Sequence, residues 1–139
     1  MPSKRETILA RVATALAGTA GVAGRIYRSR VIPLARNEAP ALVVEPVGDQ
    51  AVQDTLGTLL WTLTFRVSVI VRGNVPDQLA DAALVDIHSK LMGDATLDGM
   101  VVQLLPTTTA FEILEADQPA GVVSAEFTAQ YRTALNSLS

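Results

Sequence analysis

The sequence predicts a single α+β domain over residues 1–139, with a mostly antiparallel sheet and two main helices packed on it. Three observations favour this fold class. Some segments alternate apolar and polar residues as strands do, others repeat apolar residues at helical spacing, and no linker, internal repeat or low-complexity tract divides the chain. A chain of 139 residues has the usual size of one domain and can bury roughly two-thirds of the surface that its unfolded form exposes.

The composition indicates a core of aliphatic side chains. Hydrophobic residues make up 49% of the chain, aromatic residues only 4%, and cysteine is absent. Without cysteine the chain has no disulfide, thiolate nucleophile, zinc ribbon or iron–sulfur cluster. The formal net charge of -3 argues against broad DNA binding, which needs a surplus of Lys and Arg. We therefore expect no nucleic-acid partner that is recognised by sequence, although local basic patches are compatible with this charge.

The first predicted element is a helix from Lys4 to Leu16. Ser3 and Glu6 have the spacing of a capping box, in which the hydroxyl and the carboxylate each accept from a main-chain amide. The basic start followed by alanines also suggests a signal peptide, but Glu6 and Arg11 interrupt the region that such peptides keep uncharged. The uncharged stretch from Val12 to Gly24 has 13 residues, fewer than the roughly 20 of a membrane helix. We expect no membrane span.

Two short strands are predicted next, from Arg25 to Ile32 and from Ala41 to Glu45. Pro33 closes the first, because proline cannot donate to a ladder, which makes this segment an edge or an interface. Pro46 bounds the second. The polar residues from Gly48 to Thr55 are predicted to form a loop.

The clearest feature is a predicted strand from Leu59 to Val71. Apolar residues occupy every second position and mostly polar residues lie between them, so one face is expected to be buried and the other largely wet. At roughly 3.3 Å per residue the strand would extend about 40 Å. We expect it to project past its neighbours or into a partner.

Pro76 and Asp77 open a second predicted helix, which ends at Gly93. Its apolar stripe consists of Ala80, Leu84, Ile87 and Leu91. Beyond it, Met100 to Leu105 and Phe111 to Leu114 are predicted to form a hairpin around Pro106 to Thr109. The last alternating segment, from Val123 to Tyr131, is predicted to pair with the long strand.

No segment has the spacing of a catalytic, cofactor or metal site. The single histidine, His88, lies on a helix flank without the partners of a metal or nucleophile array. Asp94 and Asp98 fail the spacing of a calcium loop and are typical of a turn. The glycines at 18, 21 and 24 follow a helix rather than a strand, which argues against a dinucleotide site. Glu112 and Glu115 would face opposite sides of a strand, so they are more typical of a solvated face.

One local charge bias stands out between residues 25 and 36, where the sequence has four arginines and no acidic residue before Glu38. It fits either a charged sheet edge that blocks aggregation or a docking patch for an acidic neighbour, such as another copy of the chain. The candidate contact residues are these four arginines, the neighbouring aromatic residue and one residue near each end of the long strand. They are Arg25, Tyr27, Arg28, Arg30, Arg36, Trp61 and Arg72.

Two sequence segments, together with the order of the predicted elements between them, resemble a known family over nearly the whole chain. They are R-I-Y-R-S-R-V-I-P-L-A-R-N-E-A-P-A-L-V-V-E-P from Arg25 to Pro46 and E-A-D-Q-P-A-G-V-V-S-A-E-F-T-A-Q-Y-R-T from Glu115 to Thr133. In this layout the chain resembles the tail terminator or minor tail proteins of long-tailed bacteriophages and prophages.

The resemblance implies a non-enzymatic structural protein of the virion tail, present in the host cytoplasm during assembly. It implies a ring, often of six copies, that caps the tail tube and meets the head connector, with no cofactor and no shared catalytic residues. A small bacterial ligand-binding or interaction module is the alternative. An enzyme using His88 or Asp98 is a more distant one.

Overall fold

The computed structural model describes residues 2–22, 24–29, 40–114 and 120–139. Two helices and five strands follow one another as α1 Lys4–Ala15, β1 Ile26–Arg28, β2 Ala41–Thr55, β3 Thr58–Arg72, α2 Pro76–Met92, β4 Gln103–Leu114 and β5 Ala120–Ala134. The strands form one sheet in the order β1-β2-β3-β5-β4. All neighbours are antiparallel except β1 and β2, which are parallel. The predicted α+β fold is confirmed.

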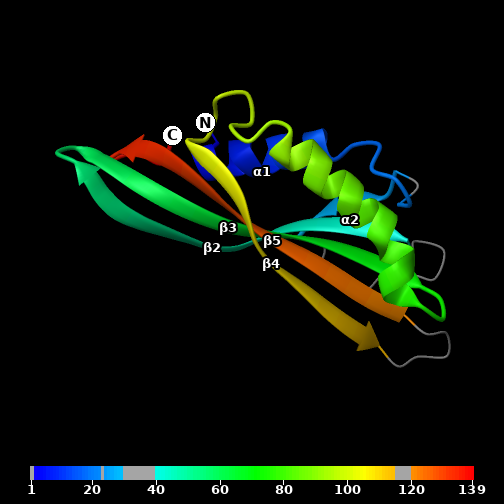
Figure 1. Cartoon of the computed structure of the whole chain (residues 1–139). Coiled ribbons are helices and arrows are strands. Elements are labelled where there is room, and N and C mark those ends of the chain that lie inside the picture. Colours follow the sequence, from blue (N-terminus) through cyan, green and yellow to red (C-terminus); the bar gives the residue numbers. More distant parts are fainter. Residues whose placement is uncertain (1, 23, 30–39, 115–119) are drawn as a thin grey trace.

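Both helices lie on one face of the sheet, and the β2–β3 hairpin extends away from them (Figure 1). We call the helix side the covered face and the other side the open face. Fully buried side chains between the helices and the sheet include Ile8, Val12, Leu42, Leu63, Phe65, Ile87, Leu91 and Phe127. The aliphatic core expected from the composition therefore fills the space between these two layers.

The alternation of the long strand is confirmed from Leu63 to Val71, where every second side chain is buried under the helices. The predicted overhang is wrong. β3 pairs with β5 over all fifteen of its residues, and β2 follows β3 to the tip of the hairpin. The neighbours of β3 are as long as β3 itself.

The loop predicted from Gly48 to Thr55 is also wrong, because β2 continues through Pro46 to Thr55. A register shift between Pro46 and Gly48 places a bulge where proline offers no amide to the ladder. Beyond it most β2 side chains are exposed. A strand without a buried face has no alternation, and its polar sequence resembles that of a loop.

The predicted hairpin around Pro106 is replaced by a single strand, β4, which pairs with β5 along its length. Here too a register shift, between Pro106 and Thr108, accommodates the proline. Residues 100–102 lie before the strand. The last predicted strand is confirmed as β5, and it pairs with β3 as expected.

The helices are confirmed with small changes. Ser3 accepts the Glu6 amide at the start of α1, as a capping residue does, while the Glu6 carboxylate binds Arg28. α2 begins at Pro76 and has Gly93 as its C-cap, and Ala83 rather than the half-buried Leu84 is buried on its stripe. Of the strand predicted from Arg25 to Ile32, the described residues contain β1, and residues 30–32 lie outside the described residues.

Candidate functional site

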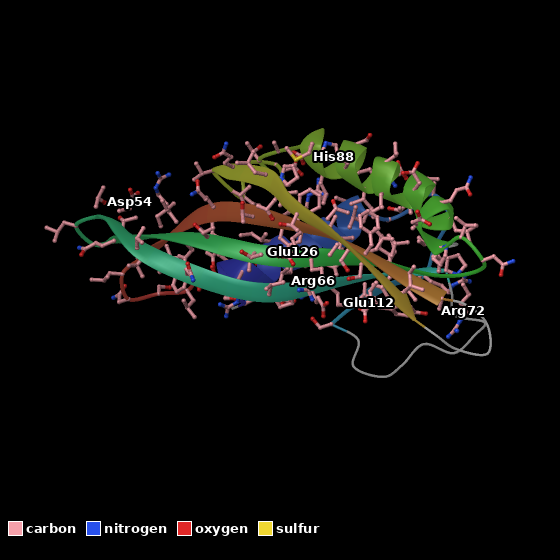
Figure 2. All side chains as sticks on the ribbon, turned by 60° about the horizontal axis from the view of Figure 1, so that its bottom comes forward. Asp54, Arg66, Arg72, His88, Glu112 and Glu126 are labelled. Atoms are coloured by element: carbon pink, nitrogen blue, oxygen red, sulfur yellow. The ribbon has the colours of Figure 1, made fainter. Side chains whose placement is uncertain are left out.

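The side chains considered for chemistry remain dispersed. His88 is exposed on α2, away from the centre of the sheet (Figure 2). Asp94 accepts the Asp98 amide within a turn, and Arg11 binds both carboxylates at 3.4 and 3.0 Å, so this pair is a structural turn. Within the described ranges no group of three or more His, Asp or Glu side chains could hold a metal ion, and no helix has the length and apolarity to cross a membrane.

The open face carries charges that neutralise one another. Arg66 lies between Glu45 on β2 and Glu126 on β5, with an N–O distance of 3.3 Å to each (Figure 2). Next to it the Ser68 and Ser124 hydroxyls are 2.9 Å apart. The centre of this face is therefore polar, but it offers no excess charge to a partner.

Three candidate contact residues meet on or beside β1, an edge strand of the described sheet. Arg28 points to the covered side, where its guanidinium binds Glu6 on α1 at 3.0 Å. Arg25 donates from Nε to the Pro40 carbonyl at 2.8 Å, and Tyr27 is half-buried between these arginines. The predicted edge position is confirmed. Arg30 and Arg36 lie outside the described residues.

Trp61 lies far from this cluster, towards the hairpin end of β3, whereas Arg72 lies at the other end of β3, two residues beyond Ile70, which pairs with Ala41 on β2 beside β1. The Trp61 ring stacks on Tyr131 with centroids 6.2 Å apart, and its Nε1 donates to Thr133 at 2.9 Å. The Arg72 Nε is buried and has no hydrogen-bond partner within the described part of the chain. The structure therefore does not bring all candidate contact residues onto one surface.

A second edge feature, absent from the sequence predictions, lies where β4 meets α2. Phe111 and Ile113 are 67% and 75% exposed on β4. The acidic edge, as we call it, consists of these two residues and the carboxylates Asp77, Asp81 and Glu112. A hollow of about 570 Å³ between α2 and β4 is lined by the side chains of both aspartates and of Phe111.

The carboxylates of the acidic edge form no ion pair in the described ranges. An exposed apolar centre with a charged rim is typical of a protein contact surface. Two signals could have found it. The residues F-E-I alternate from Phe111, and the two aspartates are spaced i, i+4 on one helix face.

A buried polar cluster connects the hairpin to α1. The Tyr131 hydroxyl donates to Asp49 Oδ2, which also binds Arg5 at 3.3 Å. The side chain of Asp49 is only 5% exposed, and its Oδ1 is buried without a hydrogen-bond partner among the described residues. Burial, followed by the hydrogen bond to Asp49, raises the pKa of Tyr131 well above its ordinary value.

This shift predicts a loss of stability in alkali. Because the folded chain retains the Tyr131 proton above about pH 10, where the unfolded chain releases it, rising pH favours the unfolded chain. Urea unfolding at several pH values from about 9 to 11.5 should show a steeper loss in the wild type than in Tyr131→Phe, which lacks the titrating group. Equal slopes in the two proteins would contradict this role.

Comparisons with known proteins complete the description. No protein-family model matches the sequence, and no curated protein matches it. Among solved structures the chain is similar to a chain from the "Virion of native gene transfer agent (GTA) particle", with a TM-score of 0.65 and 15% sequence identity. The similarity covers 91% of this chain and 95% of that chain. The two chains thus share a fold over nearly their whole length.

Proposed function

We propose that this chain is a structural protein of a phage-like virion. It forms a ring at the end of the tail tube and takes part in tail completion or head–tail joining. The observation that carries the proposal is the fold shared almost end to end with a chain of a gene transfer agent virion. The resemblance of the two sequence segments to tail terminator and minor tail proteins supports a position of this protein at the end of the tail.

The arrangement of surfaces supports assembly rather than catalysis. A ring of identical copies needs two different patches on each copy, because the patch on one side meets the other patch of the next copy. The basic β1 strand and the acidic edge lie at opposite edges of one sheet. The partners are further copies of the chain, the tail-tube protein below the ring and the head connector above it.

Light scattering coupled to size-exclusion chromatography tests the assembly. We expect one discrete oligomer whose fraction rises with protein concentration, together with a monomer at low concentration. Purified tails incubated with the labelled chain should bind it at one end only, as seen by electron microscopy. A chain that stays monomeric at every concentration and does not bind tails would contradict the proposal.

A further inference from the structure

The two edge features lie at the same level of the sheet. The paired residues define rows that cross all five strands. One row contains Ile26, Leu42, Val69, Val123 and Phe111, and another contains Arg28, Val44, Val67, Ala125 and Thr109. Arg25 directly precedes Ile26, so it falls in the row of Glu112, which contains Ala41, Ile70 and Val122. The short β1 strand is therefore level with the second half of β4.

The strand directions also match. β1 runs parallel to β2, while β4 runs opposite to β5 and therefore in the direction of β3. β1 and β4 consequently run in opposite directions. If the β4 edge of one copy meets the β1 edge of an equally oriented copy, the two strands are antiparallel, as in most of this sheet.

Within the described residues, both edges present main-chain groups for this pairing at that level. The Arg25 carbonyl and the Ser29 amide bond to β2, so the main-chain groups of Ile26 and Arg28 point away from it. On β4, Pro106 and the bulge beside it make the first half a poor acceptor of another strand. The remaining half, Thr108 to Leu114, is the part level with β1.

The charges are complementary on each side of the sheet. On the open side, Arg25 is in the row of Glu112, which Figure 2 shows at the β4 edge. On the covered side, Arg28, whose guanidinium also binds Glu6 of its own chain, is level with the hollow that Asp77 and Asp81 line. Apolar side chains lie between these pairs, because Ile26 shares a row with the exposed Phe111.

We infer that β1 of one copy adds to β4 of the next copy as an antiparallel strand, with Arg25 facing Glu112 and Arg28 facing the aspartates of α2. The contact joins two different edges, so it propagates around a ring and continues the sheet from copy to copy. It also covers an exposed strand edge that would otherwise invite aggregation. This inference rests on the proposed ring and names the surfaces that close it.

Charge reversal tests the contact. Arg25→Glu places two acids face to face at every contact, and Glu112→Arg places two bases there, so each variant alone should self-associate at least about tenfold more weakly than the wild type. An equimolar mixture of the two variants should regain assembly, because alternating copies restore every opposite-charge pair. The Arg25→Glu/Glu112→Arg chain should assemble as the wild type does.

Thermal unfolding of each single variant at low concentration controls for loss of the fold. The inference would be overturned if the single variants assembled as the wild type does, or if a mixture of the folded variants stayed dissociated. Either result would leave the ring proposal intact. A wild-type chain that never assembles would count against the ring proposal itself, and this contact would fail with it.

Cysteine cross-linking locates the contact directly, since the chain has no cysteine of its own. In the Arg25→Cys/Glu112→Cys variant, strands paired as inferred bring the two Cα atoms to about 4.5–5.5 Å, within the reach of a disulfide. Within one copy the positions are four strand spacings apart, roughly 19 Å, which prevents an internal bond.

Mild oxidation of the assembled variant should therefore give a ladder of covalent oligomers on denaturing gels, and each single-cysteine variant should give at most dimers. An assembled double variant that yields no ladder would place the contact elsewhere and overturn the inference, again without affecting the ring proposal.

Discussion

Replacement of Phe127 by alanine is expected to lower the free energy of unfolding by about 3–5 kcal/mol. Phe127 is 1% exposed at the centre of the core, and its ring stacks on Phe65 with centroids 5.6 Å apart. Alanine would remove the stacked partner and leave a cavity between the helices and the sheet, which the surrounding strands cannot collapse to fill. Urea unfolding followed by tryptophan fluorescence measures the change, because Trp61 is the single tryptophan.

Phe111→Ala is the matched control, since it makes the same substitution on the neighbouring strand. Phe111 is 67% exposed, so its loss should change the stability of the monomer by less than about 1 kcal/mol. If the inferred contact is correct, this control should still weaken assembly. Similar destabilisation of the monomer by both changes would contradict the assignment of Phe127 to the core and Phe111 to the surface.

Asp49→Ala is expected to destabilise the chain by about 2 kcal/mol, because it leaves the buried Tyr131 hydroxyl without its acceptor. The lost pair with Arg5 adds little, since that arginine side chain is 40% exposed. The substitution should also loosen the hairpin from α1. Hydrogen exchange should become faster in the hairpin half of β2 than in the half paired with β1.

Asp54→Ala controls for the loss of an ion pair on the same strand. Its carboxylate binds Arg132 near the hairpin tip, where both side chains are partly exposed, so its loss should cost less than about 1 kcal/mol. Equal effects of the two substitutions would show that the buried hydroxyl of Tyr131 is not what makes Asp49 important.

The sequence predicted those elements that have one face in the core and the other in solvent. β3, β5 and both helices have one buried and one wet side, and hydrophobic periodicity reports this difference directly. The outer half of β2 was missed, and β4 was predicted as two strands, because periodicity reports burial rather than pairing. In both, a proline suggested an end to the strand, yet a bulge allowed pairing to continue.

From the sequence we located the candidate surface on one edge only. The arginines near β1 are close in sequence, so their bias was visible before their position in the fold was known. The acidic edge combines Asp77 and Asp81 on α2 with Phe111 and Glu112 on β4. Their positions depend on the strand order, in which β5 lies between β3 and β4. No local pattern in the sequence indicates that order.

The same strand order has a consequence for the timing of folding during synthesis. β5 follows all other strands in the chain, yet it occupies the place between β3 and β4. β4 leaves the ribosome before its only partner in the described sheet exists, and the core lacks Phe127 until then. The core of the nascent chain therefore stays open until β5 has been synthesised, which exposes the chain to chaperones up to that point.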